Sequence, residues 1–96
     1  MAVSSTYLAK VKLSLRVTST TFDSQITDLI EEALLDLTQT ADIKTFAYDQ
    51  ADALQSGAII AYVSYKWFND SKYFEVYNDM KTKMALSSKY RSVMTS

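Results

Sequence analysis

Apolar residues recur at helical spacing along much of the chain, and they are densest from residue 54 to residue 68. On a helix that advances about 100° per residue, this stretch has two nearly opposite apolar faces. The first face comprises Leu54, Gly57, Ala58, Ala61, Tyr65 and Phe68. The second comprises Ile59, Ile60, Val63 and Trp67. A helix that is apolar on both sides is either wrapped by its own chain or covered on one side by another protein, and the pattern leaves both readings open.

Residues 22–37 have the clearest one-sided pattern, with apolar side chains in one sector of the helix and carboxylates in the other. The apolar sector comprises Ile26, Leu29, Ile30, Ala33, Leu34 and Leu37. The opposite side carries Asp28, Glu31, Glu32 and Asp36. Leu35 departs from this pattern and is expected to point outward among the carboxylates. Thr20 and Asp23 have the spacing of a capping box, which predicts that the helix starts there.

The pattern near the N-terminus is less regular. A helix is predicted over residues 6–17, where Ser5 or Thr6 can cap its first turn. Residues 11–17 also alternate between apolar and polar side chains, which is the period of a strand. The absence of an obvious pairing partner favours the helix.

A fourth helix is predicted over residues 72–88, after a short polar turn at residues 69–71. Its apolar stripe comprises Tyr73, Val76, Tyr77, Met80 and Met84. Because the turn is short, this helix and the helix over 54–68 are expected to be antiparallel neighbours.

The remaining segments have no steady period. Residues 38–48 are too apolar for a free linker and are expected to pack across the bundle, and Asp49 with Asp52 can cap the helix that follows. Residues 87–96 are small, polar and basic, and we expect a loose tail. The sequence therefore predicts an all-α fold: one domain over residues 1–96, a small bundle of about four helices with an irregular segment between the second and third.

Composition narrows the chemistry that this chain can perform. It has one glycine and no proline, so little interrupts long helices. It has neither cysteine nor histidine, which removes thiol nucleophiles, imidazole bases and the usual zinc ligands. We therefore expect no enzymatic activity, no cofactor and no metal site.

The charge balance narrows the choice of partners. Ten basic side chains stand against eleven acidic ones, which is not the charge pattern of a protein that binds phosphate backbones tightly. The N-terminal region lacks the uninterrupted apolar core of a signal peptide, and the stretch over 54–68 is shorter than the roughly 20 residues that span a bilayer. We expect a soluble protein that does not associate with membranes.

Several side chains are candidates for contact with another protein, each with a plainer alternative. Trp67 and Phe74 lie off the core stripes and are either interface or core residues. The same holds for Leu35, which can be an innocuous exposed leucine, and for Ile59, Ile60 and Val63. The carboxylates of Asp28, Glu31 and Glu32 are predicted to face water or a partner.

Positive charge gathers near the C-terminus, at Lys81, Lys83, Lys89 and Arg91. It complements the negative pole of a helix end. In an alternative reading, it meets the acidic second helix of a neighbouring copy.

Taken in order, four stretches resemble the head–tail connector proteins of long-tailed bacteriophages, which are also called adaptor or head-completion proteins. They are LAKVKLSLRV, FDSQITDLIEEAL, LQSGAIIAYV and YNDMKTKMALSSKYR, and they span residues 7–91. The resemblance lies in the order, spacing and total length of diffuse apolar patterns rather than in a catalytic signature.

This resemblance implies a helical subunit without enzymatic activity that forms a ring, commonly dodecameric, in the virion. The ring assembles in the host cytoplasm, docks beneath the portal protein and extends the DNA channel towards a stopper or tail-completion protein. DNA passes through without sequence-specific binding. The C-terminal segment of such proteins often docks onto the portal, which corresponds here to Lys89, Tyr90 and Arg91. Some relatives have a longer loop between the second and third helices, which is absent between Asp42 and Tyr48.

Two other functions fit the same composition. A small helical DNA-binding regulator could use the third helix for recognition, but its surface would have to be more basic. A cytosolic adaptor module for an unrelated partner is the other alternative.

Overall fold

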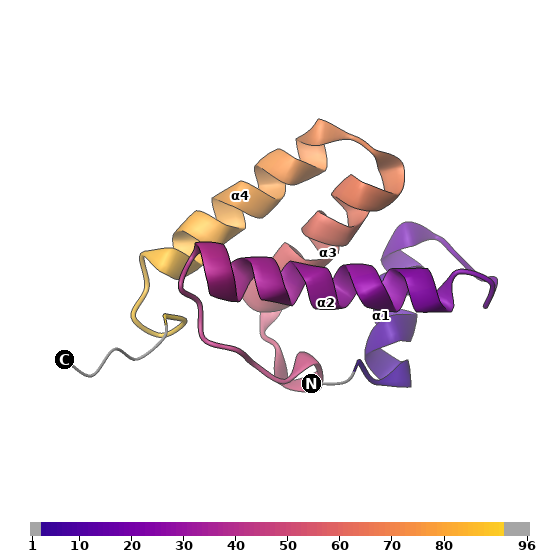
Figure 1. Ribbon diagram of the computed structural model, residues 1–96, viewed down its shortest axis with the longest axis horizontal. Coiled ribbons are helices and arrows are strands. Elements are labelled where there is room, and N and C mark those ends of the chain that lie inside the picture. The colour runs from indigo at the N-terminus through magenta and orange to yellow at the C-terminus, as the bar shows by residue number, and fades with distance from the viewer. Residues whose placement is uncertain (1–2, 92–96) are drawn as a thin grey trace.

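The computed structural model describes residues 3–91, which form four α-helices, one short 3-10 helix and no strand (Figure 1). The all-α prediction is confirmed, and residues 11–15, for which a strand was the alternative, are helical. The elements are α1 (Ser5–Leu15), α2 (Asp23–Thr40), η1 (Tyr48–Gln50), α3 (Ala53–Phe68) and α4 (Ser71–Ala85).

Polar side chains cap the N-termini of three of the four helices. Ser4 caps α1 by accepting a hydrogen bond from the Tyr7 amide at 3.0 Å, one residue before the predicted Ser5. Asp52 caps α3 in a reciprocal capping box with Gln55. Asp70 caps α4, directly after Asn69 has ended α3 in the left-handed conformation. These caps satisfy amide groups that the first turn of a helix leaves without partners.

The start of α2 differs from the prediction. Thr20 and Asp23 form no capping box; Phe22 precedes the helix and supplies no side-chain hydrogen bond to it. Asp23 instead forms an ion pair with Lys12 of α1, with Nζ and Oδ1 2.7 Å apart. The Asp23 carboxylate, for which the sequence pattern predicts a capping role, therefore forms a contact between two helices instead.

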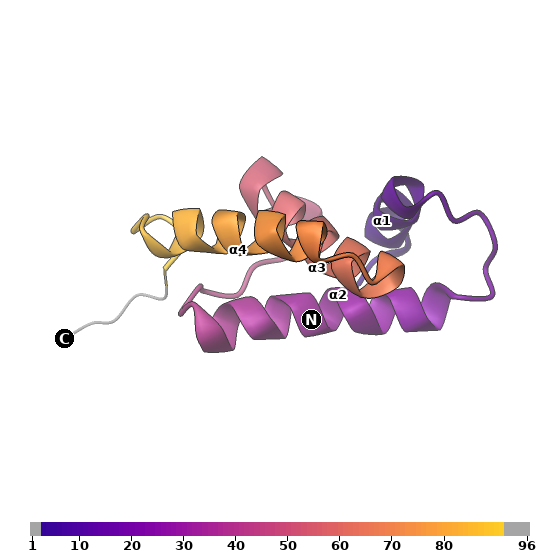
Figure 2. The same ribbon diagram turned by 90° about the horizontal axis from the view of Figure 1, so that it is seen from above.

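The helices are arranged around α3. Seen from above, α2 runs along one side of the molecule, and α1 and α4 lie on the opposite side of the molecule (Figure 2). α3 contacts α1, α2 and α4. It forms an antiparallel hairpin with α4, as the short turn predicts. The two-faced helix is thus wrapped by its own chain.

Each apolar face of α3 has a neighbour within the chain. On the first face, a side chain at Gly57 would meet the sulfur of Met80, which lies 3.0 Å from the position of a Cβ atom, so the glycine permits close approach of α4. On the second face, Ile59 and Val63 are fully buried. Both belong to the core of this chain and are no longer candidates for a subunit interface. Ile60 and Trp67 are only partly covered.

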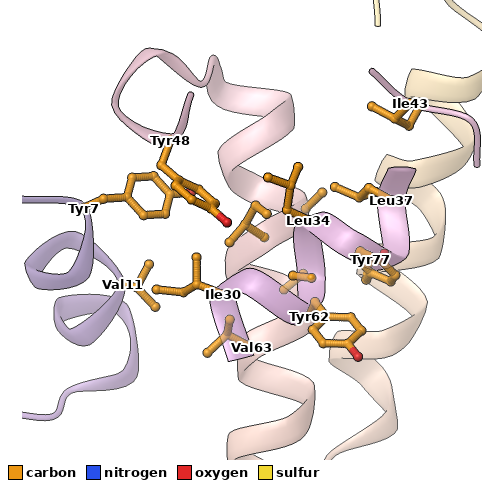
Figure 3. Packing of buried hydrophobic residues seen from close by; sticks show 14 of the residues in the cluster. Tyr7, Val11, Ile30, Leu34, Leu37, Ile43, Tyr48, Tyr62, Val63 and Tyr77 are labelled. Carbon is orange, nitrogen blue, oxygen red and sulfur yellow. The ribbon is translucent and has the colours of Figure 1, made fainter. Parts of the chain in front are cut away.

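The core joins all of these elements. Tyr7 of α1 lies against Tyr48 of η1, with ring centroids 5.3 Å apart. Figure 3 shows this pair, with Ile30 of α2 next to Val11 of α1. The irregular segment contributes Ile43, which is also fully buried. This segment packs across the bundle, as its apolar content predicts.

Residues 87–91 are attached to the body of the molecule. The ring of Tyr90 is buried, and its hydroxyl donates a hydrogen bond of 2.7 Å to Asp52. The Lys44 amide donates to the Tyr90 carbonyl at 2.9 Å, and Ile43 forms an isolated antiparallel bridge with Arg91. This part of the predicted loose tail is therefore held in place, whereas residues 92–96 lie outside the described residues.

Candidate functional site

A groove lies between the middle of α2 and the irregular segment that follows it. Its volume is about 560 Å³. We call it the α2 groove, and it is lined by Glu31, Leu34, Leu35, Thr38, Ile43, Thr45 and Tyr48. The lining residues Leu34, Ile43 and Tyr48 are buried, whereas Leu35 is 53% exposed. Leu35 points outward, as predicted, but beside a hollow that is partly apolar rather than in isolation.

The carboxylates of α2 divide into two groups. Asp28 and Glu31 are exposed on the same side of the helix as Leu35. Glu32 and Asp36 instead accept hydrogen bonds from Tyr62 of α3 and Tyr77 of α4. Glu32 stays exposed while it accepts this bond, in line with the prediction that the acidic side faces water or a partner, whereas Asp36 is half-buried and its carboxylate is held within the chain.

Lysines complete both of these polar contacts. Lys66 Nζ lies 3.7 Å from Glu32, and Lys81 Nζ lies 3.5 Å from Asp36. Burial, followed by the neighbouring Asp36 carboxylate, raises the pKa of the Tyr77 hydroxyl above its ordinary value. Burial and Glu32 raise the pKa of Tyr62 in the same way. Both phenols stay protonated and keep donating, which makes these contacts structural.

The groove has a titratable group of its own. Burial is the main cause that raises the pKa of Tyr48 to about 12, and the charges of Glu31 and Tyr7 add to it. Glu31 thus lies close enough to influence the groove floor electrostatically. The arrangement is that of a recognition surface, with apolar walls and a negative rim.

A second apolar surface lies where α3 turns into α4. Four aromatic side chains gather there as two pairs across the hairpin, and we call them the aromatic tip: Tyr65, Phe68, Tyr73 and Phe74. The centroids of Phe68 and Tyr73 are 5.7 Å apart, and those of Tyr65 and Phe74 are 4.8 Å apart. Phe68 is 47% exposed and Phe74 38% exposed.

The composition of the tip departs partly from expectation. Phase along the helices predicts that Phe74 lies off the core stripe, and its exposure agrees with that prediction. The apolar stripes of the sequence include Tyr65, Tyr73 and Phe68, whereas the structure leaves Tyr65 and Tyr73 half-buried and Phe68 exposed. A signal that could have located the tip is the presence of aromatic residues on both sides of the Asn69–Asp70 turn, because a short turn leaves the hairpin end uncovered.

Trp67 lies beside the tip but is occupied within the chain. Its ring packs edge to face against Phe22, with centroids 5.3 Å apart. The tryptophan is partly buried against the core. It connects the start of α2 to the end of α3, so its first role is in packing.

The basic residues near the C-terminus have acidic neighbours in the same chain. Lys81 pairs with Asp36, Lys83 with Asp79 four residues earlier, and Lys89 with Asp52. These ion pairs remove much of the support for a contact between this end and the α2 helix of another copy. Lys89, Tyr90 and Arg91, the candidates for portal docking, lie together on the attached segment 87–91, with Lys89 and Arg91 exposed.

Residues 3–91 contain no cluster of three or more acidic side chains placed to hold a metal ion. Within the same range, no helix combines the length and apolar character needed to cross a bilayer. Comparison with protein-family models, with curated proteins and with solved structures finds no match for this chain. The groove and the tip are therefore interpreted from their own geometry.

Proposed function

We propose that this protein is a structural, non-enzymatic head–tail connector subunit of a long-tailed bacteriophage. It forms a ring beneath the portal and extends the DNA channel towards the stopper or tail-completion protein. The observation that carries the proposal is that one small subunit presents two separate, partly apolar surfaces, the α2 groove and the aromatic tip. A ring of identical subunits needs two different contact patches on each copy.

Two further features support this function. The resemblance to connector proteins extends over residues 7–91, in the order and spacing of its helical patterns. In addition, within residues 3–91 five lysines form ion pairs with carboxylates of the same chain: Lys12, Lys66, Lys81, Lys83 and Lys89. Paired lysines contribute less to phosphate binding, and weak binding suits the wall of a channel through which DNA must move.

The direct test uses the cognate portal protein of the proposed phage. Purified portal rings are mixed with the subunit and imaged by electron microscopy. We expect an added ring of density on one face of the portal, and none on a portal from an unrelated phage. The absence of binding to the cognate portal contradicts the proposal. A tight, salt-dependent shift of duplex DNA in a gel favours the DNA-binding regulator instead.

A further inference from the structure

We infer that residues 87–91 act as a releasable latch on the α2 groove. While attached, they hold the outer wall of the groove in place, and a partner that draws them away frees that wall. The outer wall is residues 43–47 of the irregular segment, of which Ile43 and Thr45 line the groove. The latch itself depends on contacts within one chain, and only the identity of the partner rests on the proposed function.

The outer wall has little backbone support of its own. Residues 44–47 belong to no helix or strand. Within residues 3–91, the only amide of this stretch that donates a hydrogen bond to the backbone is that of Lys44, and its acceptor is the Tyr90 carbonyl of the latch, at 2.9 Å. Ile43, one residue earlier, forms the antiparallel bridge with Arg91, where the two segments lie side by side (Figure 1). The latch therefore supplies the backbone pairing of the wall.

Side chains anchor the wall at its two ends. At one end, Asp42 has a φ of 57°, a left-handed conformation that is unfavourable for a residue other than glycine. The Ile43 side chain is fully buried, but its amide donates to the Leu37 carbonyl at 3.3 Å, which is long for such a bond. At the other end, Tyr48 packs against Tyr7. The backbone between these anchors depends on the latch for its position.

The latch is held weakly enough to be released. Tyr90 is the only buried side chain among residues 87–91. Its hydroxyl donates to Asp52 at 2.7 Å, and Lys89 Nζ lies 3.5 Å from the same carboxylate. The Lys89 side chain is 71% exposed, and an ion pair in contact with water contributes little to stability. A segment with one buried side chain opens at a lower free energy than the whole fold.

The latch coincides with the residues proposed to contact the portal. Of Lys89, Tyr90 and Arg91, the tyrosine is buried and is not available to a partner while the latch is attached. A partner that takes Tyr90 has to break its contacts with Asp52 and Lys44. Docking of this segment and release of the outer wall are then one step, because the partner favours the open state. Binding at the C-terminal segment thereby changes the groove beside α2.

The first experiment removes the one buried side chain of the latch with Tyr90→Ala. The informative amide is that of Ile43, which donates to Leu37 rather than to the latch. Its hydrogen exchange, measured by NMR, should accelerate at least about tenfold if the latch holds the wall. The amide of Ala33, in the interior of α2, should keep its rate, because the release is local.

A matched control and a milder variant accompany this measurement. Lys83→Ala removes the ion pair with Asp79, which involves neither the wall nor the latch, so both exchange rates should stay unchanged. Tyr90→Phe keeps the ring and loses only the hydrogen bond to Asp52, so exchange at Ile43 should accelerate less than in Tyr90→Ala. The milder variant tests the latch even if Tyr90→Ala does not fold.

A second measurement reports on the groove itself. Tyr48 lines the groove directly after the outer wall, and burial is the main cause that raises its pKa to about 12. If the freed wall admits water, NMR of the ring carbon should show this pKa falling towards 10.0 in Tyr90→Ala and staying near 12 in Lys83→Ala. A loss of stability without movement of the wall leaves the pKa of Tyr48 unchanged.

The link to docking is tested with portal rings. Asp52→Asn weakens the attachment of Lys89 and Tyr90 by removing the carboxylate charge, yet it changes none of the docking candidates. If the latch has to open before docking, this variant should bind the portal at least about threefold more tightly than the unmodified chain. Equal or weaker binding would show that docking does not draw the latch away.

The inference is overturned if Tyr90→Ala and Tyr90→Phe leave both the exchange of Ile43 and the pKa of Tyr48 as they are in the unmodified chain. These measurements need no portal, so they are separate from the test of the proposed function. A working latch without portal binding removes the function and assigns residues 87–91 to another partner. Portal binding without movement of the wall keeps the function and removes the latch.

Discussion

Tyrosine hydroxyls make the polar contacts between distant parts of this chain. Tyr7 hydrogen-bonds with Ser56 at 3.0 Å, Tyr62 and Tyr77 donate to carboxylates of α2, and Tyr90 donates to Asp52. A phenol places its ring in an apolar core and extends its hydroxyl to a polar group at the edge. Four of the seven tyrosines therefore act in folding, and their number is weaker evidence for an interface than it appears from composition.

Tyr48 should make the stability of the fold depend on alkaline pH. Its pKa in the folded state is about 12, above the ordinary value of 10.0, so folding favours the neutral phenol. The stability it contributes is fully present below pH 10 and is lost as the pH rises through about 12. Tyr48→Phe cannot ionise, so it should lose less free energy of unfolding across this range, by about 1 kcal/mol after screening by water. Denaturant unfolding at a series of pH values measures the difference.

The role of Glu31 in this titration can be tested separately. Its carboxylate is the second cause of the raised pKa of Tyr48, after burial. Glu31→Gln should move that pKa part of the way back towards 10.0, as followed by NMR of the tyrosine ring carbon. Glu75→Gln, which changes an exposed carboxylate on α4, is the control. Equal effects of the two variants would show that the influence is not local to the groove.

At the scale of elements, the sequence shows where a helix begins and ends more clearly than it shows which of the helix's faces is covered by the same chain. The limits of α3 follow from Asp52 at its start and Asn69 at its end, both visible in the sequence. Burial of Ile59 and Val63 could not be derived in the same way. A helical pattern shows that a face is apolar, but it does not show whether the same chain or another one covers it.

The candidate site was predictable to a similar extent. Leu35 stands out in the sequence because it is apolar among carboxylates. The hollow beside it includes Ile43 and Tyr48, which come from a segment without periodicity, so no pattern could place them there. The attachment of Tyr90 likewise depends on contacts with Lys44 and Asp52, far away in the sequence.

Asp52 should couple the start of α3 to the C-terminal segment. One of its oxygens accepts from the Gln55 amide, and the other accepts from Tyr90 and lies 3.5 Å from Lys89. Desolvation works to raise the pKa of Asp52, but these three contacts outweigh it and hold the pKa below its ordinary value. Asp52→Ala should destabilise the protein by about 1–2 kcal/mol and expose the Lys44 amide to hydrogen exchange. Chemical unfolding and exchange mass spectrometry measure the two effects.

Two milder variants separate the two roles of Asp52. Tyr90→Phe removes only the hydrogen bond from Tyr90 to Asp52, so exchange at Lys44 should rise while the start of α3 keeps its protection. Asp52→Asn retains a good capping side chain and should cost less than Asp52→Ala. Unchanged protection of Lys44 in both Asp52→Ala and Tyr90→Phe would contradict the coupling.

At the scale of the whole molecule, the apolar surface left outside lies away from the centre of the fold. α3 is covered by α1, α2 and α4, so the surplus apolar face expected from the sequence is largely used internally. Exposed apolar side chains remain at the tip and beside the groove, and also at Leu13 on α1 and Leu86 after α4. The physical argument for self-assembly therefore depends on these exposed surfaces, and its strength can be measured without any partner.

If assembly covers the tip and the groove, the stability of the protein should rise with its concentration. A process that binds the folded state stabilises it by mass action, by about 2.7 kcal/mol at a hundredfold excess over the dissociation constant. For a chain of 96 residues, that corresponds to a rise of roughly 13 °C in melting temperature. Calorimetry over a wide concentration range should show this rise for the unmodified chain and for Leu13→Asp, but not for Leu35→Asp. A melting temperature independent of concentration in all three proteins would mean that the two surfaces do not associate on their own, and that any ring depends on the portal as a template.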